Sequence, residues 1–123
     1  MSFHGWEKVN LEQALDLLKN VQELFTDEKK WIYWPIAQND KSIEVQSIDP
    51  SATQFCLMGA LESITQKKYE QPLASYIECA TFEYLDDLSG NELMKGKFSY
   101  KEEVTLIAEA IKELEKDVKT NSK

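Results

Sequence analysis

Few residues in this chain are of the kinds that bind metals or form covalent intermediates. Among its 123 residues there are one histidine, His4, and two cysteines, Cys56 and Cys79. A zinc site needs clustered cysteine and histidine, and a reactive thiolate needs a histidine base, a cationic neighbour or a helix N-terminus. Both cysteines instead lie in apolar stretches with helical periodicity. We therefore expect two reduced, buried thiols, with a Cys56–Cys79 disulfide as the alternative, and no catalytic residue, metal or cofactor.

Glycine is scarce too, and the four glycines form no phosphate-binding loop. They fit neither G-x-x-x-x-G-K nor G-x-G-x-x-G, the patterns whose backbone amides cradle phosphate groups. The G-x-S-x-G pattern of serine esterases is also absent. A site built from carboxylates alone stays open, with Glu83, Asp86 and Asp87 as a secondary candidate polar cluster. The alternative for these three residues is a solvated helix end.

The sequence also has no long apolar run and no excess of positive charge. It shows neither the roughly 18 consecutive apolar residues of a membrane span nor the apolar segment of a signal peptide at its start, so we expect a cytoplasmic protein that does not bind membranes. The net charge is −8, whereas nucleic-acid binding needs lysine and arginine to neutralise phosphates. We expect no nucleic-acid partner. The acidity indicates either simple solubility or a basic protein partner.

What is present is a globular composition, with 42% hydrophobic and 29% charged residues, which is typical of one folded domain. We predict a single domain over 1–123, with flexible ends at 1–9 and 119–123. The predicted fold class is mostly α, with about four helices packed around a central helix 50–67 and a small β-hairpin.

The central helix is predicted from its start signal and its apolar content. Asp49 is a favourable N-cap, and Pro50 suits the first helical position. Apolar residues then cover most of the helix surface, which is typical of a helix buried on several sides. Gly59 lies inside it. Because a mid-helix glycine costs about 1 kcal/mol relative to alanine, we expect another backbone to pass close to Gly59.

Three further helices are predicted from capping signals and from the helical spacing of apolar residues. Asn10 opens a helix that ends near Thr26, and Ser99 opens the last helix. Each is followed three residues later by a glutamine or glutamate, the pattern of a capping box. Between these two helices, Pro72 begins a helix that Gly90 ends.

The aromatic segment WIYWPIAQ at 31–38 changes the pattern from helix to strand. Its β-branched and aromatic residues favour a strand, and Pro35 restricts that strand to a sheet edge. Polar and apolar residues alternate at 42–47. We therefore predict a small irregular hairpin between 31–38 and 42–47, which must lie against helices because a lone hairpin is marginally stable in water.

The aromatic residues of this segment are the main candidates for binding. Alternation places Trp31 and Tyr33 on one face of the strand and Trp34 on the other, and a short hairpin hardly buries both faces. Exposed tryptophan and tyrosine mark binding hot spots. The candidate binding surface comprises Trp31, Tyr33, Trp34, Pro35 and Gln38. The alternative is that one face packs on the helices and the other is an ordinary surface aromatic.

Short patterns spread over residues 11–115 carry a resemblance. They are W-x5-A ending at Ala37, P-x-A beginning at Pro50, F-C-L-x-G-A-L at 55–61, and a serine-capped helix from Ser99 with Glu–Val and late Ala–Ile pairs. Together they resemble a family of small bacterial and phage proteins that carries no assigned function. The resemblance implies the mostly helical fold predicted above, and it implies no particular activity.

Two functions follow as hypotheses. The first is a small acidic, non-enzymatic protein-interaction module that acts as an inhibitor, by analogy in size and charge with phage anti-defence and immunity proteins. The second is a nucleotide- or metabolite-binding protein, or an enzyme, with a pocket between the aromatic hairpin and the central helix. The sequence indicates neither the partner nor the oligomeric state.

Overall fold

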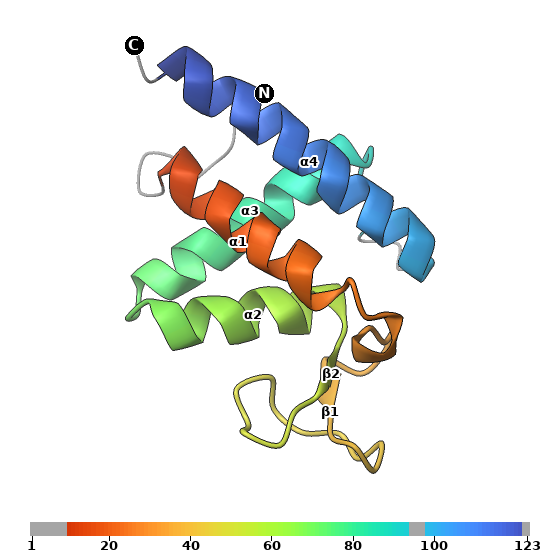
Figure 1. The fold of residues 1–123 in the computed structure, drawn as a ribbon. Helices are drawn as coiled ribbons and strands as arrows, with labels where there is room; N and C mark the ends of the chain where they lie inside the picture. The colour runs from red at the N-terminus through yellow and green to blue at the C-terminus, as the bar shows by residue number, and fades with distance from the viewer. Residues whose placement is uncertain (1–9, 94–97, 122–123) are drawn as a thin grey trace.

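The structure is a computed structural model that describes residues 10–93 and 98–121, so the predicted flexible leader 1–9 lies outside the described residues. Four α-helices and a two-stranded antiparallel sheet make up the fold (Figure 1), which confirms the mostly α class with a small β element. The elements are α1 Leu11–Leu24, the 3₁₀ helix η2 Glu28–Lys30, β1 Ala37–Gln38, β2 Gln54–Phe55, α2 Leu57–Lys68, α3 Leu73–Leu88 and α4 Tyr100–Asn121.

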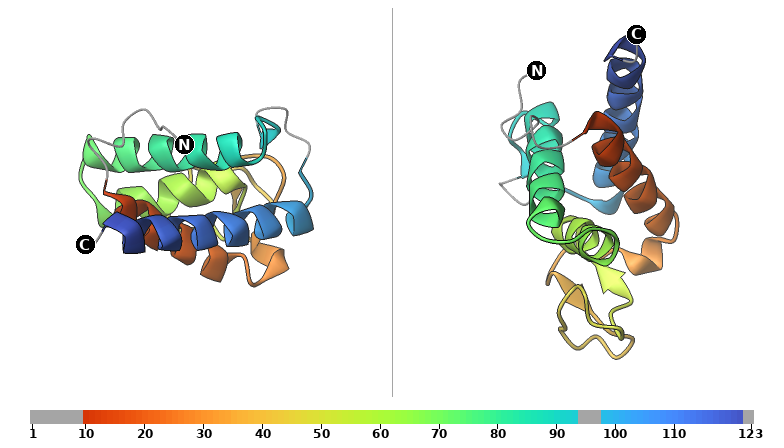
Figure 2. Two further views of the ribbon diagram at one scale, coloured as in Figure 1. Left: turned by 90° about the horizontal axis from the view of Figure 1, so that it is seen from above. Right: turned by 90° about the vertical axis from the view of Figure 1, so that its left-hand side faces the viewer.

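The helices form two packed pairs. Helix α1 lies along α4, and α2 lies along α3, while the two strands and their connecting loop lie on the side of α2 that faces away from α4 (Figures 1 and 2). Helices α1 and α3 each contact all three other helices, so they share the centre of the fold, and α2 contacts α1, α3 and β2. The largest fully buried side chains between the pairs include Leu17, Leu18, Leu61, Ile77, Tyr84, Leu85, Ile107 and Leu114.

The predicted helix starts at Asn10 and Ser99 are confirmed as capping boxes. Asn10 Oδ1 accepts a hydrogen bond from the Glu12 amide at 2.7 Å, and the Gln13 side chain accepts one from the Asn10 amide at 3.0 Å. Ser99 and Glu102 exchange the equivalent bonds at 3.2 and 3.0 Å. Each cap satisfies amides that have no partner inside the helix.

The predicted ends of the last two helices have different outcomes. Gly90 adopts a left-handed φ of 75° directly after α3, as expected of a residue that terminates a helix. Helix α4 continues through Asn121, so residues 119–121 of the predicted flexible end are helical, and their flexibility stays a prediction. Residues 122–123 lie outside the described residues.

The predicted start of the central helix at 50 is wrong. Helix α2 begins at Leu57, with Cys56 as its N-cap. Asp49 does accept from a backbone amide, but within a turn: its Oδ1 accepts hydrogen bonds from the amide and hydroxyl of Ser51 at 2.8 and 2.7 Å. An Asp-Pro pair favours a turn as readily as a helix start, and strand pairing at 54–55 then keeps the chain extended before the helix.

The predicted pairing of 31–38 with 42–47 is also mostly wrong. Strand β1 pairs with β2, with Ala37 opposite Phe55 and Gln38 opposite Gln54. Segment 42–47 touches β1 only through an isolated bridge between Gln38 and Glu44 and nearby backbone hydrogen bonds. The β1–β2 pairing buries Ala37 and Phe55 in the main core, whereas in segment 42–47 Val45 is only partly buried and Ile43 is 56% exposed.

The close backbone approach predicted at Gly59 is confirmed. A Cβ atom added to Gly59 would lie 2.0 Å from the carbonyl oxygen of Ile36, a contact that real Cβ atoms essentially never make. The same carbonyl oxygen accepts a hydrogen bond from the Cys56 amide at 3.0 Å. Gly59 therefore lets the aromatic segment lie directly on the first turn of α2.

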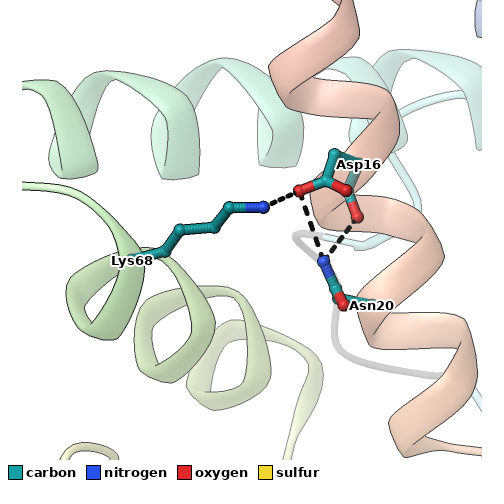
Figure 3. Close-up of polar contacts among 3 residues, drawn as sticks. All are labelled: Asp16, Asn20 and Lys68. Carbon is teal, nitrogen blue, oxygen red and sulfur yellow. Dashed lines mark hydrogen bonds and ion pairs between the residues drawn. The ribbon is translucent and has the colours of Figure 1, made fainter.

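A polar contact joins the far end of α2 to α1. Lys68 at the end of α2 pairs with the carboxylate of Asp16 on α1, and Asn20 donates to the backbone carbonyl of Asp16 at 2.9 Å (Figure 3). Both charged side chains are about half exposed, so solvent weakens their attraction, and such pairs typically contribute about 0–1 kcal/mol. The packing of the helices, and not this pair, stabilises the α1–α2 arrangement.

Candidate functional site

Trp31 is partly buried and is held in place by contacts with α4. Its indole Nε1 donates a hydrogen bond to Glu103 Oε2 on α4 at 3.0 Å, although the two residues are 72 positions apart. Its ring meets the ring of Tyr100 edge-on, with centroids 5.8 Å apart. These contacts fix the start of the aromatic segment against α4.

Two other residues of the predicted surface are also engaged in the fold. The Gln38 side chain donates to Gln54 Oε1 at 2.7 Å, across the β1–β2 pair. Pro35 is half-buried. The structure therefore does not place the five predicted residues on one open surface.

Tyr33 and Trp34 do remain open to solvent. Trp34 is 75% exposed, Tyr33 is 55% exposed, and Ile36 is 42% exposed. Ile48 in the loop and Met58 on α2 are also exposed. We call these five residues, Tyr33, Trp34, Ile36, Ile48 and Met58, the exposed apolar surface. An exposed group of large apolar side chains is a feature of interaction sites.

The members of the exposed apolar surface are joined through α2 and a groove. Ile36 lies against Gly59, the residue after Met58. Tyr33 and Met58 line one cavity, and Ile36 and Ile48 line one groove. The exposed apolar surface therefore has members in the aromatic segment, at the start of α2 and in the loop at residue 48.

The groove beside Ile36 combines apolar and acidic side chains. It has a volume of about 730 Å³. Its lining residues are Ile36, Glu44, Val45, Gln46, Ser47, Ile48, Glu62 and Gln66. Ser47 donates a hydrogen bond to Glu62. Partial burial, with the negative charge of Glu62, raises the pKa of Glu78 on α3 to about 7. We call this hollow the acidic groove, and a positively charged group suits it.

A second hollow contains a buried carboxyl group, and we call it the Glu103 cavity. Its volume is about 120 Å³. The lining residues are Tyr33, Cys56, Leu57, Met58, Phe82, Leu93, Phe98 and Glu103. Glu103 is only 7% exposed. Burial raises the pKa of Glu103 to about 7, although the hydrogen bond from Trp31 lowers it.

The two cysteines differ in their surroundings. Cys56 is half-buried at the start of α2, its Sγ accepts from the Gly59 amide at 3.5 Å, and burial raises the pKa of its thiol. Cys79 is exposed, so the prediction that it is buried is wrong. Both thiols are free, and the alternative of a Cys56–Cys79 disulfide is not formed.

The secondary polar cluster does not join either hollow. Glu83 and Asp87 are exposed on α3 and Asp86 is half-buried beside them. The backbone carbonyl of Asp86 accepts a hydrogen bond from the Ser89 hydroxyl at 2.7 Å. Other residues line the groove and the cavity. Among residues 10–93 and 98–121, no group of three or more histidine, cysteine or acidic side chains is arranged to hold a metal ion.

Sequence reasoning missed Glu103. It is not among the candidate residues of the sequence analysis, yet it lies four residues before Ile107 and eleven before Leu114, which are both buried. A carboxylate in register with an apolar stripe is the signal that could have indicated its burial.

Comparison with protein-family models, curated proteins and solved structures found no match. The resemblance described above therefore stays a prediction. In the described part of the chain, no helix has both the length and the apolar character needed to cross a membrane.

Proposed function

We propose that this chain is a non-enzymatic protein-interaction module of the cytoplasm, and that it binds a partner protein through the exposed apolar surface. The observation that carries the proposal is the 75% exposure of Trp34, beside the 55% exposure of Tyr33. Tryptophan and tyrosine are the residues most enriched in binding hot spots. An inhibitory role, in which the chain blocks its partner, is the form of this function that its size and acidity favour.

The partner is a protein with a basic face. The acidic groove adjoins the exposed apolar surface through Ile36 and Ile48, and it presents Glu44 and Glu62. The whole chain carries a net charge of −8. A lysine or arginine side chain of the partner would meet opposite charge in the groove, while apolar residues of the partner cover Trp34. Such charge complementarity speeds association and selects partners.

The expected contribution of Trp34 follows from its exposed area. A tryptophan buries about 150–250 Å² when covered, and burial of roughly three-quarters of that area at about 25 cal/mol per Å² corresponds to about 3–5 kcal/mol. Part of this gain is offset by ordering and desolvation. We therefore expect Trp34→Ala to weaken binding by about 2 kcal/mol or more, which is about 30-fold.

The test is capture of a protein partner from the native host, followed by affinity measurement with the purified pair. Trp34→Ala is the test variant. Tyr76→Ala is the control, because Tyr76 is another exposed aromatic residue, 39% exposed on α3 and outside the surface. Circular dichroism verifies that both variants fold.

The proposal requires that Trp34→Ala loses the partner while Tyr76→Ala keeps it. It also requires that affinity falls as salt concentration rises, because charges contribute to the contact. Equal affinity of Trp34→Ala and wild type would remove this surface from the function.

Small-molecule binding is the second candidate. The specific observation in its favour is the Glu103 cavity, which lies between Tyr33 of the aromatic segment and Leu57 of α2. The polar group there is Glu103, and not the predicted cluster of Glu83, Asp86 and Asp87.

A further inference from the structure

The Glu103 cavity has the size of one small ring. An engineered protein cavity of about 150 Å³ that is lined by apolar side chains stays dry and binds benzene. The Glu103 cavity, at about 120 Å³, therefore accommodates a five- or six-membered ring with at most a small substituent. Nucleotides and sugars are too large for it.

The walls of the cavity favour a flat apolar body. Phe82 comes from α3, Phe98 precedes α4, and Leu57 and Met58 form the first turn of α2. Aromatic rings pack against one another edge-on or offset, and methionine adapts its shape to a ring. Leu57 belongs to the main core and Phe82 and Phe98 pack against it, so the core holds these walls in place, whereas Tyr33 and Met58, which also line the space, are exposed.

One side of the cavity is a carboxyl group with spare hydrogen-bonding capacity. Within the described residues, the hydrogen bond to the Glu103 carboxyl comes from Trp31 and uses Oε2. A carboxylate has two oxygens and accepts several hydrogen bonds. Since Glu103 also lines the cavity, its remaining acceptor positions are available to a ligand inside.

The charge of that carboxyl group determines which ligands fit. The pKa of Glu103 lies near 7 because burial disfavours the charged form. Cys56 and Tyr33 are the other titratable groups that line the cavity, and burial raises the pKa of the Cys56 thiol. Among the described residues that line it, the cavity has a carboxyl group and no lysine or arginine, and a positively charged donor would stabilise the ionised form of Glu103.

We propose that the Glu103 cavity binds a small monocyclic nitrogen base in its protonated form, with the ring among Phe82, Phe98 and Leu57 and an N–H group donating to Glu103. This proposal gives a ligand class to the small-molecule candidate. Trp34 does not line the cavity, whereas Tyr33 and Met58 belong both to the cavity and to the exposed apolar surface.

The first experiment is a titration of the full chain, followed by NMR, with 4-aminopyridine as a cationic ring and toluene as a neutral ring of the same number of heavy atoms. We expect 4-aminopyridine to shift signals of Phe82, Phe98 and Met58. Glu103→Gln keeps the size of the side chain and removes its charge, so it should weaken 4-aminopyridine binding about tenfold or more and change toluene binding little. Glu109→Gln, an exposed position on the same helix, is the matched control and should bind like wild type.

The pH profile adds a second requirement. The cationic ring needs the ionised carboxylate, so its affinity should rise by up to about tenfold per pH unit below 7 and level off above it. An unchanged affinity of Glu103→Gln for 4-aminopyridine overturns the proposal, and so does a lack of shifts at these three residues in wild type.

A second measurement leaves Glu103 unchanged, so that the proposal can be tested even if the Glu103→Gln variant fails to fold. In a Cys79→Ser chain, Cys56 is the one remaining thiol, and it lines the cavity. Bound 4-aminopyridine should slow the alkylation of Cys56 severalfold. An alkylation rate that does not respond to the ligand also overturns the proposal, while the result with Trp34→Ala decides the partner-binding function separately.

Discussion

The contact between Gly59 and Ile36 makes Gly59→Ala the sharpest test of the fold. The added Cβ would lie 2.0 Å from a backbone oxygen, and a backbone atom cannot move aside as the end of a side chain can. The aromatic segment must therefore separate from α2, or α2 must shift. Overpacking of this kind costs about 1–3 kcal/mol.

Two further terms enter the expected change in stability. Separation stretches the 3.0 Å hydrogen bond from the Cys56 amide to Ile36, which costs about 1 kcal/mol. Alanine is better than glycine inside a helix by about 1 kcal/mol. These two terms cancel approximately, so the free energy of unfolding should fall by about 1–3 kcal/mol, and the melting temperature by roughly 4–12 °C for a chain of this size.

The assay is urea unfolding of wild type, Gly59→Ala and the matched control Gly90→Ala. Gly90 has a φ of 75° and open space around its Cβ position, so the control loses about 1 kcal/mol from backbone strain alone. Gly59→Ala should also change the NMR signals of Ile36 and Trp34, whereas the control should not. A Gly59→Ala chain as stable as wild type would mean that the aromatic segment does not lie on α2 as described.

Two other predictions concern Glu103. Because burial raises its folded-state pKa from the ordinary 4.5 to about 7, the folded chain keeps a proton that the unfolded chain releases between these values, so the contribution of Glu103 to stability falls as pH rises from 4.5 to 7. Urea unfolding across this range should show wild type losing stability relative to Glu103→Gln, and parallel profiles would contradict the burial of this carboxyl group. Trp31→Phe removes the hydrogen bond to Glu103 and should lower the free energy of unfolding by about 1–3 kcal/mol. It should also raise the pKa of Glu103 further, as an NMR titration of its carboxyl carbon would measure, and an unchanged pKa would show that the indole does not hold this group.

The parts of the fold that could be predicted are those set by near neighbours in the chain. The capping boxes at Asn10 and Ser99 join residues three positions apart. Gly90 ends its helix through its own backbone conformation. The close backbone approach at Gly59 could be predicted because glycine is unfavourable inside a helix, and helix propensity is a local property.

The parts that could not be predicted depend on contacts between distant residues. Asp49 and Pro50 suit a helix start and a turn equally, and only the pairing of 54–55 with 37–38 decides for the turn. Trp31 was expected on a binding surface, but Glu103 and Tyr100 hold it in the fold. Of the predicted surface, Tyr33 and Trp34 remain the exposed pair.

The sequence by itself determined the mostly α class, the helix caps, the acidic charge and the presence of an aromatic segment. Periodicity and capping depend on residues that are close together in the chain, and net charge depends on composition alone. Only the tertiary structure decided which aromatics face solvent, that Cys56 caps α2, and that Glu103 is buried beside a cavity. Burial depends on which surfaces of α2, α3 and α4 meet, and the free energy of that packing is summed over residues that lie far apart in the chain.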